Sequence, residues 1–134
     1  MDLSLFHLDE VTDMDIKIKR VYEEPSDADG MRILVDRMWP RGIKKENLLM
    51  DSWEKGLAPM SDLRKWYSHD PAKYDEFRKR YFAELDTSSE SEDFVSRISA
   101  YDGTVTLLFS AKDTQHSNAY VLNEWIEKRH HQNV

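Results

Sequence analysis

Residues Arg32-Ile-Leu-Val-Asp-Arg-Met-Trp-Pro-Arg-Gly42 decide the fold of this 134-residue chain. Within them, Ile33–Val35 is continuously apolar, which is typical of a strand covered on both faces. Polar and bulky residues follow immediately, and they include Arg37 and Arg41. We therefore expect a central strand whose carboxyl end leads into an arginine-lined loop.

Two further segments have the pattern of strands. Val105–Phe109 is a second continuously apolar run, so it needs cover of the same kind. Residues 16–22 instead alternate apolar and charged side chains, which predicts a half-exposed strand toward an edge of the sheet. The central strands are separated by helical patterns, which favours parallel pairing. The fold class predicted is α/β: a single small domain with a mainly parallel central sheet flanked by helices on both faces.

Four segments have helical patterns. Residues 61–67 predict a short helix, and a longer one should follow Asp70, a residue suited to the N-cap, and Pro71. In this longer helix the apolar side chains recur at helical spacing, at Tyr74, Phe77, Tyr81, Phe82 and Leu85. A third helix is expected over 94–101, after a polar loop over 86–93. The last helix should begin near Asp113 or Thr114.

Composition excludes several classes of protein. The chain has no cysteine, so disulfides, thiolate nucleophiles and cysteine-based metal sites are excluded. The five histidines show no metal-binding spacing, and the four glycines form no phosphate-binding or dinucleotide-binding motif. We expect no metal site and no cofactor. No apolar run is long enough for a membrane span, so we expect no membrane association and a cytoplasmic location.

Charge divides the chain into three parts. Residues 1–30 carry 9 acids and 3 bases, residues 31–82 carry 8 acids and 12 bases, and residues 83–134 carry 9 acids and 4 bases. The net charge of −7 therefore hides a basic middle. An acidic protein is a poor general nucleic-acid binder, but a local basic cluster can hold a small anion. We treat residues 1–15 as an acidic N-terminal extension and 16–134 as the one domain; oligomeric state is not predicted.

The candidate site lies where the two central strands end, because ligands of α/β sheets bind beyond the carboxyl ends of the strands. Arginine forks suit carboxylate or phosphate groups, and the start of the last helix adds backbone donors. Asp36 or His116 could move a proton, and these two are the candidate catalytic residues. The candidate ligand-binding residues are Arg37, Trp39, Arg41, Arg64, Lys112, Ser117 and Asn118.

Three functions remain open from the residues. The first is a binding module for a small anion such as a phosphate, a carboxylate or a nucleotide. The second is a hydrolase or transferase that acts on an anionic substrate through Asp36 and His116. The third is a structural or protein-interaction domain in which Asp36 pairs with Arg37, Arg41 or Arg64 only to stabilise the fold. Trp39 could likewise be a lid over the core instead of a stacking surface.

A series of motifs resembles the YeaO-like family of bacterial proteins. The most specific is Val35-Asp-Arg-Met-Trp-Pro-Arg-Gly42; others are Lys19-Arg-Val-Tyr22, Ala58-Pro59, Leu63-Arg-Lys65, Phe77-Arg78, Val105-Thr-Leu-Leu108 and Ala111-Lys112. The resemblance spans about residues 16 to 128. It implies a compact α/β fold and a bacterial cytoplasmic origin, and it implies no reaction, because the family is one of unknown function.

Two positions depart from the pattern of this family. Met60 stands where the family usually has serine, so a hydroxyl that could cap a helix or bind a ligand is lost or passes to Ser61. Asn118 stands where many members have histidine. A mechanism that used the family's histidine would therefore need His116 instead.

Overall fold

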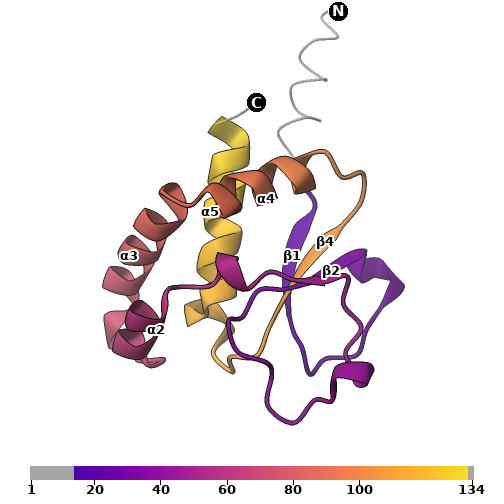
Figure 1. Ribbon diagram of the computed structural model, residues 1–134, viewed down its shortest axis with the longest axis horizontal. Helices are drawn as coiled ribbons and strands as arrows, with labels where there is room; N and C mark the ends of the chain where they lie inside the picture. The colour runs from indigo at the N-terminus through magenta and orange to yellow at the C-terminus, as the bar shows by residue number, and fades with distance from the viewer. Residues whose placement is uncertain (1–13, 133–134) are drawn as a thin grey trace, which may run out of the picture.

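The computed structural model describes residues 14–132 and contains one parallel four-stranded sheet (Figure 1). Residues 1–13, which hold most of the proposed acidic extension, lie outside the described residues, as do 133–134. The strand order is β1-β4-β2-β3, and every neighbouring pair is parallel. The strands are β1 Ile16–Arg20, β2 Met31–Leu34, β3 Ser52–Trp53 and β4 Val105–Phe109.

The predicted positions of three strands in the sheet are confirmed. The two apolar runs form β2 and β4, which lie side by side in the middle with Ile33 opposite Leu107. The alternating segment forms β1 at one edge. The two-residue strand β3 was not predicted, because Ser52 and Trp53 are too short a run to show a period.

Most of the predicted helices are confirmed, with two shifts. The helices are α2 Ser61–Tyr67, α3 Tyr74–Asp86, α4 Ser89–Ser99 and α5 Asn118–Gln132; single 3-10 turns are η1 Asp27–Asp29, η2 Lys45–Asn47, η3 Lys55–Leu57, η4 Pro71–Lys73 and η5 Thr114–His116. None of the helices in residues 14–132 is long and apolar enough to cross a membrane.

The first shift concerns the polar segment 86–93, which was expected to be a loop and is mostly helical. Ser88 caps α4 by accepting a hydrogen bond from the Ser91 N–H (3.3 Å), so the polar residues from Ser89 to Asp93 become its first turns. The second shift is at the last helix. The predicted start at Asp113 or Thr114 is the turn η5, and α5 itself begins at Asn118.

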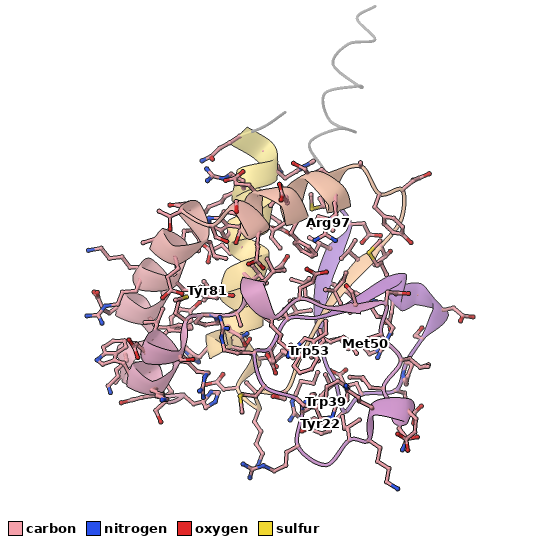
Figure 2. The ribbon with its side chains drawn as sticks, in the orientation of Figure 1. Tyr22, Trp39, Met50, Trp53, Tyr81 and Arg97 are labelled. Atoms are coloured by element: carbon pink, nitrogen blue, oxygen red, sulfur yellow. The ribbon has the colours of Figure 1, made fainter. Side chains whose placement is uncertain are left out.

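All four described α-helices pack on one face of the sheet. Val105, Leu107 and Phe109 of β4 point into a core that they share with Phe77 and Tyr81 of α3, as well as with side chains of α2, α4 and α5. In Figure 1 the helices α2, α3 and α5 lie on the left of the strands. Figure 2 shows Tyr81 on this helical side, and its side chain is fully buried.

The opposite face is covered by a loop. Leu34 and Leu108 pack there beneath side chains from residues 39–53, and Figure 2 shows Trp39, Met50 and Trp53 grouped on this side. The parallel α/β sheet is as expected, but its second face has no α-helix among residues 14–132. The physical reason is that large apolar side chains of β3 and of the connection before it bury this face without an α-helix: Trp39, Ile43, Leu48, Met50 and Trp53.

A buried ion cluster lies at the amino end of β2. The Asp29 carboxylate has no exposed surface and accepts from Lys19 Nζ (3.0 Å) and from the Arg32 guanidinium, with Lys17 Nζ at 3.4 Å. Gly30 then turns the chain into β2 at φ 62°, and a Cβ there would lie 2.1 Å from the Thr104 carbonyl oxygen. The start of the strand is therefore held by paired charges and by a glycine that no other residue can replace without strain.

Candidate functional site

A pocket of about 490 Å³ opens at the carboxyl ends of β2 and β4. This is the edge of the sheet that the sequence predicted. The pocket is bounded by the loop after β2, the turns around α2, the end of β4 and the start of α5. Its lining residues are Asp36, Arg37, Met38, Trp39, Arg41, Ala58, Pro59, Arg64, Lys65, Tyr67, Ser68, His69, Phe77, Ser110, Ala111 and Asn118.

Asp36 joins the ends of the two central strands. Its Oδ2 accepts hydrogen bonds from the Ser110 N–H (2.9 Å) and the Ser110 hydroxyl (2.8 Å), and its Oδ1 accepts from Asn118 Nδ2 (3.3 Å). Burial raises the pKa of Asp36 above its usual value of 3.8, although the Ser110 and Asn118 hydrogen bonds oppose the shift. The hydrogen bonds therefore fix the orientation of the Asp36 carboxyl, and burial makes its charged form less favourable than in water.

The expected pairing of Asp36 with arginine does not occur. Among residues 14–132, no carboxylate lies within 4.0 Å of the guanidinium of Arg37, Arg41 or Arg64. Arg37 instead donates to the Pro59 and Ala58 carbonyls, at 3.2 and 3.4 Å.

The pocket carries a local excess of positive charge. Arg37, Arg41, Arg64 and Lys65 are four cations against the single carboxylate of Asp36, a formal excess of three when histidine is neutral. The chain as a whole is at −7. Cations without carboxylate partners keep a positive potential that attracts anions. The backbone of Arg41 is fixed, because its carbonyl accepts from the Tyr22 hydroxyl (2.9 Å).

Trp39 has a structural role as well as a place in the pocket wall. Its Nε1 donates to the Ile43 carbonyl (2.6 Å), and its ring makes an edge contact with Trp53 at 5.3 Å between centroids. Trp53 in turn donates to the Asp36 carbonyl (2.6 Å). The two tryptophans therefore connect the cover of the second sheet face to the backbone of the site.

Three candidate residues lie outside the lining of the pocket: Lys112, His116 and Ser117. His116 Nδ1 pairs with Asp113 Oδ2 at 2.7 Å, and its ring packs edge-on against Tyr74. The buried Ser117 hydroxyl donates to the Thr114 carbonyl and accepts from the Tyr120 N–H, which holds the first turn of α5. Asp36 and His116, the proposed catalytic pair, are thus not brought to one cavity.

The pocket contains a different histidine, His69. Burial is the largest influence on the pKa of Asp36 and raises it, and the electrostatic effect of the nearby His69 is a smaller one in the opposite direction. Ser68 and His69 both have positive φ, 45° and 55°, in the turn that follows α2. Such backbone conformations are uncommon for residues other than glycine and often occur at functional sites. No periodic pattern indicates this turn, so sequence reasoning missed it.

Tyr67 and Ser110 are two further lining residues that the candidate set lacked. The Tyr67 hydroxyl donates to the His116 carbonyl (2.6 Å), and its ring stacks on Phe77 at 3.9 Å. Burial, with smaller effects of Tyr74, Asp113 and Asp70, raises the pKa of Tyr67 to about 12, so it is neutral at pH 7. The position of Ser110 directly after an apolar strand was a signal that could have identified it.

The metal-ligating side chains of residues 14–132 form no group of three that could hold a metal ion. The polar groups of the pocket instead comprise one carboxylate, four cations, an imidazole, hydroxyls and an amide. This set suits recognition of an organic anion through charge and hydrogen bonds.

Comparisons with known proteins place the chain among uncharacterised bacterial proteins. A family model described as the inactive DUF488-N3 subclade matches residues 15–134. The uncharacterized protein YeaO of Escherichia coli is 43% identical over 113 residues, which cover 84% of this chain and 97% of that protein. The uncharacterized protein Rv3073c of Mycobacterium tuberculosis is 37% identical over 114 residues, 85% of this chain and 95% of that protein. No solved structure matches the chain.

Proposed function

Because the chain belongs to the YeaO-like family, in the subclade described as inactive DUF488-N3, we propose that it binds a small anion without transforming it. The observation that carries this proposal is the set of three arginines, Arg37, Arg41 and Arg64, that line one pocket without a carboxylate partner among residues 14–132. Guanidinium groups left unpaired at a concave site are suited to phosphate or carboxylate ligands. The candidate ligand-binding residues of the pocket are these arginines, Trp39 and Asn118.

Two alternatives have less support. One observation favours acid–base catalysis: the pKa of Asp36, which lies in a pocket, is raised. The description of the subclade as inactive weighs against it, and His116 lies outside the pocket. The structural alternative required Asp36 to neutralise the arginines, whereas its partners are Ser110 and Asn118.

Isothermal titration at low ionic strength tests the proposal, with inorganic phosphate, pyrophosphate and citrate as probes. We expect at least one of them to bind to the wild type. Arg41→Ala and Arg64→Ala should each weaken that binding by about tenfold or more, because a charge-assisted hydrogen bond contributes about 1.5–3 kcal/mol. Lys112→Ala is the matched control: it also removes one exposed cation, but from outside the pocket. Equal losses in all three variants would indicate nonspecific attraction and contradict the proposal.

A further inference from the structure

The pocket is electrically polar, and this polarity restricts what it can bind. Asp36 lies at its half-buried end with Ser110 and Asn118, whereas Arg41, Arg64 and Lys65 are exposed at its rim. The remaining cation, Arg37, is also half-buried, but its guanidinium already donates to the Pro59 and Ala58 carbonyls. The anionic group of a ligand is repelled by a carboxylate and attracted by the cations. It should therefore lie at the rim, and the opposite end of the ligand should lie at Asp36.

The hydrogen bonds of Asp36 show what that opposite end must offer. Its Oδ2 already accepts two donors, both from Ser110, at 2.9 and 2.8 Å. Its Oδ1 accepts only from Asn118, at 3.3 Å, and that same amide group also approaches the Val35 carbonyl at 3.4 Å. An ionised carboxylate offers about four acceptor positions, so Oδ1 keeps room for one N–H from a ligand.

Size and surface chemistry add a third condition. The volume of about 490 Å³ lies within the range of about 300–1,000 Å³ typical of sites for organic molecules, and an inorganic oxyanion fills only part of it. Apolar groups contribute much of the lining: Met38, Trp39, Ala58, Pro59, Tyr67, Phe77 and Ala111. The body of the ligand between its two polar ends should therefore be largely apolar or planar.

On the basis of the proposed anion binding, we infer that the ligand is a nucleoside monophosphate whose base bears an exocyclic amino group. The phosphate lies against Arg41 and Arg64 at the rim, and the amino group donates to Asp36 Oδ1. The sugar separates the two ends, and the planar base lies against the apolar wall. An α-amino acid meets these conditions poorly, because its ammonium and carboxylate are attached to the same carbon.

Pairs of nucleotides that differ only in the group proposed to contact Asp36, an amino group or a carbonyl oxygen, test this inference. Cytidine and uridine monophosphate have an amino group and a carbonyl oxygen at the same ring position, as do adenosine and inosine monophosphate. In isothermal titrations of the wild type, at least one amino-bearing nucleotide should bind about tenfold or more tightly than its partner, because a carbonyl facing Asp36 leaves two acceptors opposed. Asp36→Asn should remove or reverse this preference, since its amide can donate to a carbonyl. Asp62→Asn changes an exposed carboxylate of α2 outside the pocket and should leave the preference unchanged.

The possible outcomes separate this inference from the proposed function. If both members of each pair bind equally, or if only phosphate or citrate binds in an Arg41-dependent way, the nucleotide inference is wrong and anion binding stands. If none of the anions or nucleotides binds, both are wrong. The wild-type comparison decides the matter even if Asp36→Asn does not fold.

Discussion

Each end of strand β2 has an aspartate with basic residues nearby, but the charges are paired at one end and not at the other. At the amino end, the buried Asp29 carboxylate is surrounded by Lys17, Lys19 and Arg32. At the carboxyl end, no lysine or arginine among residues 14–132 forms a salt bridge with Asp36, and Arg37, Arg41 and Arg64 have no carboxylate within 4.0 Å. Charges are thus neutralised at the end of β2 that lies inside the fold and left without opposite charges at the end that faces the pocket. This is the difference expected between a structural cluster and the proposed binding site.

The largest effect predicted from this comparison is on stability. Asp29→Asn leaves the buried Arg32 and the half-buried Lys19 without their counter-charge, so we expect the free energy of unfolding to fall by about 3–5 kcal/mol. Asp36→Asn should change it by less than about 1 kcal/mol, because an amide oxygen can replace the carboxylate as acceptor from Ser110. Urea unfolding at pH 7 measures both. Equal losses in the two variants would remove the contrast between the ends.

The two carboxyls should also respond to pH in opposite directions. Burial alone would raise the pKa of Asp29, but the bonds from Lys19, the Ser26 N–H and Arg32 outweigh it and hold the pKa well below 3.8. Its contribution to stability is therefore fully present above about pH 4 and is lost as the pH falls through the folded-state pKa. The pKa of Asp36 is raised, so its contribution is present below about pH 4 and is lost as the pH rises through the folded-state pKa.

Unfolding experiments between about pH 2 and pH 7 check these signs. The deficit of Asp29→Asn relative to the wild type should shrink as the pH falls below about 4. Any gain in stability of Asp36→Asn over the wild type should appear only as the pH rises. A deficit of Asp29→Asn that stays constant across this range would contradict the lowered pKa.

A smaller effect on stability is expected for Arg37, whose guanidinium has hydrogen-bond partners but no carboxylate partner among residues 14–132. Its guanidinium has two backbone carbonyl partners, Ala58 and Pro59, and it tethers the segment before α2 to the loop after β2. Arg37→Ala should lower the free energy of unfolding by about 1–2 kcal/mol, which reflects these hydrogen bonds and no ion pair. Thermal unfolding measures this, and the loss should persist at high salt, since no surface ion pair is being screened.

The smallest effect is expected for the exposed arginines of the rim. Arg41→Ala and Arg64→Ala should change the free energy of unfolding by less than about 0.5 kcal/mol, because their side chains have no carboxylate partner among residues 14–132. The same variants should lose the binding measured by titration. A large drop in melting temperature without any effect on binding would favour the structural alternative.

Local sequence patterns predicted most of the helices and strands, but they did not predict the loop that covers the second face of the sheet. The apolar runs of β2 and β4, and the helical spacing from Tyr74 to Leu85, are properties of neighbouring residues, so they are visible in the sequence. The loop over the second face has no period, since Trp39, Ile43, Leu48 and Met50 pack individually. Helix α4 was placed too late because its first turns are polar and its N-cap, Ser88, lies in a run of serines and acids.

The site divides in the same way. The residues after β2, together with Arg64 and Asn118, could be identified from strand ends and charge, and the structure brings them to one pocket. His69, Tyr67 and Ser68 could not, because they come from a turn whose two left-handed residues no motif marks. His116 was placed at the start of the last helix, but the turn η5 directs it toward Asp113 and Tyr74 instead.

The sequence by itself determined the class of fold, the neighbouring central strands and the basic loop at their carboxyl ends, because periodicity and composition act through adjacent residues. Only the tertiary structure decided which charges are paired. Asp29 and Asp36 lie seven positions apart, one before β2 and one after it. The first is surrounded by cations from β1 and β2, and the second is held by Ser110 and Asn118. Pairing depends on contacts between segments far apart in the chain, and no local pattern encodes those contacts.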